Sequence, residues 1–235
     1  MIPWLEPGAP FPPVDRALRE PDGLLAAGRE LTPDRILDAY RQGIFPWFSD
    51  GQPVLWWSPD PRMVLVPSEI RITRSMHKVL RNRPYEVRCD SAFEAVMRAC
   101  AAPRDGQAGT WISDDMIAAY SALHARGYAH SVETWIDGRL AGGLYGMAIG
   151  RMFYGESMFS LEHDASKIAL VHLARYLASL NFALIDCQMN TGHLGSMGGR
   201  EIPRREFCRV MAQCIADGPL PGRWPTDLIP PYFRF

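Results

Sequence analysis

The chain has 235 residues, of which 47% are hydrophobic and 22% charged, and its formal net charge is −1. This composition is typical of a folded globular protein and excludes a disordered chain, a collagen and a coiled coil. The longest stretch without a charged residue has 13 residues, 187–199, whereas a membrane-spanning helix needs about 20 mainly apolar ones. The N-terminus lacks the pattern of a signal peptide, and five cysteines without a CxxC pair favour reduced thiols. We therefore expect a soluble, cytoplasmic protein.

Residues 1–62 are predicted to form a small N-terminal domain. They contain 11 of the 20 prolines and four of the seven tryptophans, which indicates extended chain with many turns. One helix is expected within them. Thr32 suits its N-cap, Pro33 suits its first turn, and Gly43 suits its end.

Residues 63–235 are predicted to form a second, larger domain, because strands and helices alternate along them. The expected elements are a strand at 63–66, a helix at 76–82 capped by Ser75, a strand at 85–89, a helix opened by a capping box of Ser91 and Glu94, a helix between Ser113 and Gly127, a hairpin of 130–136 and 139–149 around Asp137-Gly138, a strand at 151–159, a helix at 165–180, a strand at 182–188 and a helix from Pro203 to Gly218. The crossover between the last two strands predicts a parallel pair. The expected class is α+β, with a mixed, largely antiparallel sheet flanked by helices.

Two strands of this sheet carry acids near their carboxyl ends. Because side chains alternate along a strand, Glu156 is expected to share a face with Met158, and Asp186 with Gln188, while Cys187 faces away. The carboxyl ends of neighbouring strands are a common place for ligands. Two close carboxylates favour one raised pKa, which suits a proton acceptor for an attacking amine, or they hold a cationic substrate. The alternative is a pair of structural acids bonded to backbone amides or arginines.

An apolar pocket is possible beside these acids. Five glycines lie between residues 142 and 155, and glycine in a strand often marks close approach of the backbone to a ligand. Leu144, Phe153 and Met158 lie among or just beyond them. These three side chains either line a pocket or belong to the ordinary core.

A run of basic residues lies between the predicted strands at 63–66 and 85–89. Arg71, Arg74, Lys78 and Arg81 occur within residues 71–83, which contain no acid. In a helix, positions 74, 78 and 81 share one face. This stripe either contacts phosphates or is a solvated helix face, and nearby tryptophans are able to stack on bases.

Eight segments of the chain resemble one enzyme family. They are YRQGIFPWF (40–48), WWSPDPR (56–62), GTWI (109–112), YGESMFS (154–160), ASKIAL (165–170), LIDCQ (184–188), HLGSMGG (193–199) and IPRREF (202–207). Together, and in order, they resemble the leucyl/phenylalanyl-tRNA–protein transferases.

The resemblance implies an aminoacyltransferase of the N-end rule. Such an enzyme moves leucine or phenylalanine, less often methionine, from aminoacyl-tRNA to the N-terminal Arg or Lys of a protein and marks it for N-degron proteolysis. It implies a Gcn5-type acetyltransferase-like larger domain behind the small N-terminal one. Because the aminoacyl ester is already activated, no cofactor and no metal are expected. We also expect a monomer with no membrane contact.

The resemblance also implies roles for the polar residues. Asp186 and Gln188 look like the reaction-centre pair, with Asp186 acting either directly as a base or mainly through hydrogen bonding. Glu156 is similar to the acid that helps to bind the basic N-terminus of the acceptor.

The donor side of the site is implied by the same motifs. Trp47 and Trp111 resemble the two rings that hold the terminal adenosine of the donor. Phe153 and Met158 are expected to be walls of the pocket for the leucyl or phenylalanyl side chain, and Leu144 a further wall.

Two other classes of function are alternatives to this one. An acyl-CoA-dependent N-acetyltransferase needs a glycine-rich pyrophosphate loop, but the helix at 165–180 is preceded by LEHD, without glycine. A non-catalytic RNA-binding module would use the basic stripe and the tryptophans, but it leaves the acids Glu156 and Asp186 without a role.

Overall fold

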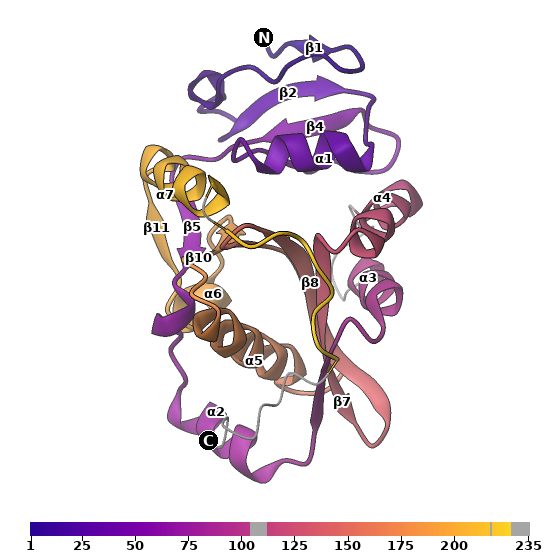
Figure 1. The fold of residues 1–235 in the computed structure, drawn as a ribbon, viewed down its shortest axis with the longest axis vertical. Helices are drawn as coiled ribbons and strands as arrows, with labels where there is room; N and C mark the ends of the chain where they lie inside the picture. Colours follow the sequence, from indigo (N-terminus) through magenta and orange to yellow (C-terminus); the bar gives the residue numbers. More distant parts are fainter. Residues whose placement is uncertain (104–111, 217, 227–235) are drawn as a thin grey trace.

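The computed structural model describes residues 1–103, 112–216 and 218–226. Its strands form two sheets, which Figure 1 shows one above the other. The smaller sheet has the strand order β1-β2-β4-β3. Its strands are β1 (Trp4–Leu5), β2 (Leu24–Gly28), β3 (Phe45–Pro46) and β4 (Val54–Trp57).

Helix α1 (Pro33–Tyr40) lies between the smaller sheet and the rest of the molecule (Figure 1). As predicted, the Thr32 hydroxyl caps it by accepting the Arg35 N–H at 3.2 Å, and Gly43 follows with a φ of 75°. The strands around it were expected only as extended chain. One hydrophobic core contains both Trp56 of the smaller sheet and Phe207 from the C-terminal part of the chain. The predicted division into two domains after residue 62 stays a prediction.

The larger sheet has the order β11-β5-β10-β9-β8-β7-β6. Its strands are β5 (Arg62–Leu65), β6 (Glu86–Cys89), β7 (Ala129–Ile136), β8 (Arg139–Ile149), β9 (Met152–Ser160), β10 (Leu184–Gln188) and β11 (Arg200–Ile202). β9 and β10 are parallel, and the other neighbouring pairs are antiparallel. The predicted α+β class and the parallel pair are thus confirmed. Asp137 and Gly138 turn the β7–β8 hairpin with φ of 50° and 71°, as a type I′ turn requires.

Helices cover both faces of the larger sheet (Figure 1). They are α2 (Arg74–Asn82), α3 (Phe93–Ala101), α4 (Asp114–Ala125), α5 (Ala165–Ser179), α6 (Gly192–Ser196) and α7 (Arg204–Ala216), with short 3-10 turns η1 (Val14–Arg16) and η2 (Pro67–Glu69). α2 and α5 pack with Leu144 and Phe153, whereas α3, α4 and α7 pack with Tyr145 and Tyr154. Neighbouring strand residues therefore belong to cores on opposite faces.

Two helix caps differ from the prediction. Thr73, not Ser75, caps α2, and its hydroxyl accepts the Met76 N–H at 3.2 Å. The capping box at Ser91 and Glu94 is wrong, because the Ser91 hydroxyl donates instead to Glu133 at 2.7 Å. Glu133 is buried and far away in sequence, so its need for hydrogen-bond donors is invisible to a local motif.

A C-terminal strap, residues 218–226, leaves α7 and crosses the larger sheet toward β7 (Figure 1). The Gly222 N–H donates to the Gly127 carbonyl at 3.1 Å, and the Cys89 N–H donates to the Thr226 carbonyl at 2.8 Å. No pattern in the sequence predicted this segment. In the part of the chain described here, no helix is both long and apolar enough to cross a bilayer.

Candidate active site

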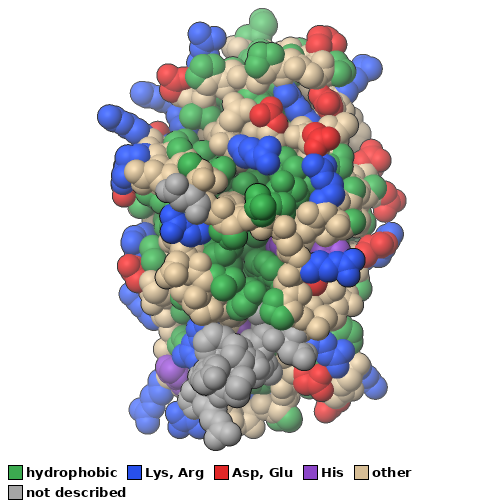
Figure 2. All heavy atoms as spheres, in the orientation of Figure 1, with side chains coloured by type: hydrophobic (Ala, Val, Ile, Leu, Met, Phe, Trp, Pro, Cys, Tyr) green, Lys and Arg blue, Asp and Glu red, His purple; other side chains and the backbone are tan. Residues whose placement is uncertain are grey.

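A cavity of about 490 Å³ lies where β3, β9, β10, α5 and α6 meet. Six of the predicted site residues line it: Trp47, Leu144, Phe153, Glu156, Met158 and Gln188. Further apolar walls come from Leu170 and Leu173 of α5 and from Ile185 of β10. Figure 2 shows apolar side chains gathered near the middle of one face of the molecule, with Lys and Arg side chains around them. The cavity itself is mainly apolar, with a few convergent polar groups, as ligand sites usually are.

Glu156 enters the cavity from a β-bulge in β9. Tyr145 of β8 pairs with Ser157 and Gly146 pairs with Gly155, so Glu156 is the extra residue between two regular pairs. A bulge breaks the alternation of side chains and re-aims the one it carries. The predicted sharing of a face with Met158 therefore does not come from simple alternation, although both residues line the cavity.

Two tyrosines hold the Glu156 carboxyl group from the inner side. The Tyr40 hydroxyl donates a hydrogen bond to Oε1, and the Tyr120 hydroxyl donates to Oε2 at 3.3 Å. The two hydroxyl oxygens are also 2.8 Å apart. The Gln188 Nε2 lies 3.5 Å from Oε1 and completes the polar end of the cavity.

Burial raises the pKa of Glu156 to about 8 from its ordinary value of 4.5. The hydrogen bond from Tyr40 lowers this pKa, and the negative charge of Asp186 raises it. The Glu156 carboxyl group therefore retains its proton at neutral pH. A cation that enters beside this carboxyl stabilises its charged form and releases the proton.

Asp186 forms a buried ion pair with Arg62 of β5. The guanidinium donates from Nε to Oδ1 at 2.7 Å and from Nη2 to Oδ2 at 2.6 Å, and both side chains are 0% exposed. The rings of Phe45 and Phe207 lie 4.8 and 4.7 Å from the guanidinium carbon, within the range of cation–π contacts. The third guanidinium nitrogen, Nη1, donates to the Gly43 carbonyl at 3.3 Å.

The prediction that Asp186 and Gln188 share a face is wrong. Gln188 has a φ of 61°, and the pairing of β10 with β5 shifts between these two residues. This backbone turn sends the Asp186 side chain to Arg62, whereas Gln188 and Cys187 both line the cavity. The Gln188 N–H donates to Asp186 Oδ1 at 2.9 Å, so the aspartate holds the turn that presents Gln188.

Cys187 was predicted to point away from the polar groups, but it contributes to the cavity wall. Burial raises the pKa of its thiol above the ordinary value, and the charge of Asp186 raises it further. The neutral thiol is therefore the stable form, which does not suit a nucleophile.

Trp47 lies at the rim of the cavity and is 37% exposed. Its ring meets the ring of Trp57 edge to face, with centroids 5.4 Å apart. The Trp57 Nε1 donates to the Trp47 carbonyl at 2.7 Å and fixes the backbone beneath the exposed ring. Trp111, the other predicted ring, lies outside the described residues.

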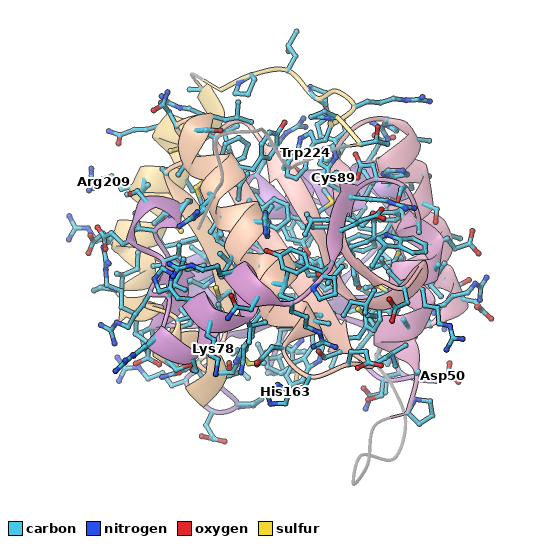
Figure 3. All side chains as sticks on the ribbon, turned by 90° about the horizontal axis from the view of Figure 1, so that it is seen from below. Asp50, Lys78, Cys89, His163, Arg209 and Trp224 are labelled. Carbon is cyan, nitrogen blue, oxygen red and sulfur yellow. The ribbon has the colours of Figure 1, made fainter. Side chains whose placement is uncertain are left out.

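The predicted basic stripe is on the surface. Arg71, Arg74, Lys78 and Arg81 are exposed, while the opposite side of α2 buries Met76 and Leu80. Figure 3 shows Lys78 on this helix. None of the four basic residues lines the cavity.

Sequence reasoning missed three residues of the polar network: Tyr40, Arg62 and Tyr120. Tyr40 and Arg62 lie within the quoted motifs YRQGIFPWF and WWSPDPR, which were the available signal. Tyr120 has no such signal and reaches Glu156 only through the fold, in which α4 packs against α1, α3 and β7. Among the described residues, no group of three or more His, Cys, Asp or Glu is arranged to hold a metal ion.

Comparison with known proteins agrees with the motifs. Residues 64–212 match the family model of the leucyl/phenylalanyl-tRNA protein transferases, and residues 29–60 match the model of their N-terminal domain. The leucyl/phenylalanyl-tRNA–protein transferase of Azoarcus sp. strain BH72 is 62% identical over 224 residues, 95% of each chain. That of Nitrosomonas europaea is 62% identical over 234 residues, 98% of each chain.

One similar solved structure is a GCN5-related N-acetyltransferase from Kribbella flavida. It is 9% identical, with a TM-score of 0.35, and the match covers 70% of this chain and 59% of the other. The fold class given above rests on the strand order and not on this likeness. The family matches and the two relatives show that the chain belongs to the leucyl/phenylalanyl-tRNA protein transferase family.

Proposed function

We propose that this protein transfers leucine or phenylalanine, and less often methionine, from aminoacyl-tRNA to the N-terminal Arg or Lys of acceptor proteins. The observation that carries the proposal is the composition of the cavity. Its walls are apolar, and its polar end brings together the Glu156 carboxyl and the Gln188 amide. An apolar aminoacyl side chain and a cationic N-terminal residue require this combination.

The apolar part of the cavity suits the aminoacyl donor. Leu144, Phe153 and Met158 would surround the leucyl or phenylalanyl side chain, and β-branched side chains would fit poorly at the mouth. Discrimination by one methylene in an apolar pocket is worth only about 1–3 kcal/mol, so the preference is graded. Trp47 at the rim is placed to stack on the terminal adenosine, and Trp111 is the expected second ring.

The polar end suits the acceptor and the reaction. The neutral α-amine attacks the ester carbonyl, a C–N bond forms, the ester C–O bond breaks, and the ribose hydroxyl leaves with the proton that the amine loses. The ester is already activated, so the reaction consumes no ATP and requires no cofactor or metal. Holding the two reactants together contributes up to roughly 7–11 kcal/mol of the barrier.

Glu156, Gln188 and Asp186 have separate roles in this proposal. Glu156 holds the cationic acceptor, and the Gln188 amide steadies the carbonyl or the amine. Asp186 is a positioning residue for Gln188, because both of its oxygens accept from Arg62 and one also accepts the Gln188 N–H. Its 0% exposure supports this role over that of a direct base.

The remaining parts of the proposal concern the partners. The exposed Arg71, Arg74, Lys78 and Arg81 are the proposed contacts to tRNA phosphates. We also propose that the protein is a cytoplasmic monomer.

A transfer assay tests the proposal. The protein is mixed with Phe-tRNA or Leu-tRNA and a peptide that begins with Arg, without ATP or coenzyme A, and mass spectrometry follows the peptide. The expected product is heavier by one Phe or Leu residue, and a matched peptide that begins with Ala gives none. The absence of product with well-charged tRNA would contradict the proposal and favour an acyl-CoA substrate, which acetyl-CoA with the same peptide would then test.

A further inference from the structure

The Trp224 ring of the C-terminal strap lies among three other rings on the α5 side of the larger sheet. It stacks on the His130 imidazole with centroids 4.0 Å apart and an interplanar angle of 5°. It meets Tyr176 of α5 edge to face at 5.2 Å, and its centroid is 5.8 Å from that of Phe153. These separations are within or close to the 4.5–7 Å at which aromatic rings attract one another.

The strap is fixed on both sides of Trp224. The Gly222 and Thr226 backbone groups are bonded to Gly127 and Cys89, as described above. The backbone N–H of Trp224 donates to Asp90 Oδ2 at 3.4 Å, and the same oxygen lies 2.8 Å from Nδ1 of His130. Figure 3 shows Trp224 and Cys89 close together in this region. The position of the Trp224 ring is therefore set by the sheet and not by α7 alone.

Phe153 connects this ring cluster to the cavity. It is fully buried in β9 and contributes to the cavity wall. The edge of its ring lies against Gly146 of β8, where an added Cβ would come within 2.6 Å of the ring carbons. With the bare backbone of Gly146 at one contact and Trp224 at another, the Phe153 ring has little freedom to move, because protein interiors contain few voids.

We propose that Trp224 is a positioning residue that sets the size of the pocket for the aminoacyl side chain. It acts through Phe153, whose ring it holds toward the cavity, and so limits how large a donor side chain fits. This inference rests on the proposed transfer from aminoacyl-tRNA. Loss of the Trp224 ring leaves space behind Phe153, which lets the wall retreat and favours Phe over the smaller Leu.

The test compares Trp224→Ala and Trp224→Phe with Leu220→Ala as the matched control. Leu220 lies on the same strap and is 90% exposed. Each variant is assayed with Leu-tRNA and Phe-tRNA and an Arg-N-terminal peptide. Trp224→Ala is expected to raise the ratio of kcat/KM for Phe to that for Leu about tenfold, near the lower limit for one methylene in an apolar pocket. In Trp224→Ala, the change is expected to appear as a higher KM for Leu-tRNA. Trp224→Phe should restore most of the wild-type ratio. Leu220→Ala should leave the ratio unchanged.

The same assay separates a structural role from the proposed one. If Trp224→Ala lowers kcat/KM for both donors by one factor, with or without a lower Tm, the inference is wrong. If the wild type transfers neither amino acid, the proposed function fails, and binding of leucyl and phenylalanyl adenosine amides, measured by calorimetry, decides the inference. A Phe-to-Leu affinity ratio that rises in Trp224→Ala supports it, and an unchanged ratio overturns it.

Discussion

The buried pair of Arg62 and Asp186 leads to a prediction about stability that single and double substitutions can test. Replacing Arg62 by Met leaves the Asp186 carboxylate buried without its cation, and replacing Asp186 by Leu leaves the guanidinium without its anion. Removing one member of a buried ion pair typically costs about 3–5 kcal/mol in the free energy of unfolding. Asp186→Leu also removes the acceptor of the Gln188 N–H, which adds about 1–3 kcal/mol.

Changing both residues together has a much smaller expected cost. Arg62→Met with Asp186→Leu replaces two buried charges by apolar groups of similar size, a change that is often neutral. If each single change costs about 3–5 kcal/mol and the double change is near neutral, the double-mutant cycle gives a coupling free energy of about 6–10 kcal/mol, whereas independent sites add within about 0.3–0.5 kcal/mol. Urea unfolding of the four proteins measures this quantity.

Thermal unfolding gives a second measure of the same effect. For a chain of this size, 1 kcal/mol corresponds to about 2–4 °C, so Arg62→Met should melt roughly 6–20 °C below the wild type, and Asp186→Leu lower still. Arg98→Ala is the control, because it breaks an exposed pair with Glu94, and exposed pairs contribute little to stability. Additive losses in the double variant, or single variants as stable as the wild type, would refute the reasoning.

The double variant also tests the positioning role of Asp186. Its stability should return except for the about 1–3 kcal/mol of the lost Gln188 hydrogen bond, but its transfer activity should not, because the Gln188 N–H still has no carboxylate to bond. Recovery of both properties would show that Asp186 does not act through Gln188.

Three other predictions concern the pKa of Glu156 and the binding of tRNA. The pKa of Glu156 is about 8 in the folded protein against an ordinary 4.5, so between these pH values the folded state binds more protons than the unfolded state and loses stability as the pH rises. The difference between the Tm of Glu156→Gln and that of the wild type should therefore increase from pH 5 to pH 9. Parallel curves of Tm against pH would contradict this. Tyr40→Phe removes a hydrogen bond that lowers the Glu156 pKa, so this pKa should rise. The fall of KM for the Arg peptide with rising pH should therefore occur at a higher pH than in the wild type. An unchanged pH profile would count against the network. Lys78→Ala with Arg81→Ala should raise KM for Leu-tRNA and Phe-tRNA equally. The slope of log KM against log salt concentration should fall by about one for each lost phosphate contact. Arg209→Ala, an exposed control on α7, should change neither quantity.

Local signals in the sequence predicted most of the regular elements. Thr32 and Ser113 cap their helices as expected, since an N-cap hydroxyl acts within three residues. Asp137-Gly138 turns its hairpin for an equally local reason, the need for positive φ at both positions. The smaller sheet was missed, because strands of two to five residues, such as β1 and β3, carry too little alternation to be recognised.

The site was predictable in its membership but not in its geometry. Motifs identified Glu156 and Gln188, yet simple alternation misplaced them, because a bulge and a left-handed backbone turn both break the period of two. The partners that fix the site lie far away in sequence. Arg62 and Asp186 are 124 positions apart, and Tyr40 and Glu156 are 116 positions apart, so only the fold brings each pair together.

The bulge in β9 separates the chemistry of this protein from its architecture. Tyr145 pairs with Ser157 and Gly146 with Gly155, so the two strands would form an unbroken ladder if position 156 were deleted. The carboxyl group on which acceptor binding is proposed to depend is thus carried by a residue that strand pairing does not require. A lineage could lose or gain this residue by a single insertion or deletion and keep the sheet, which makes the site easier to change than the scaffold around it.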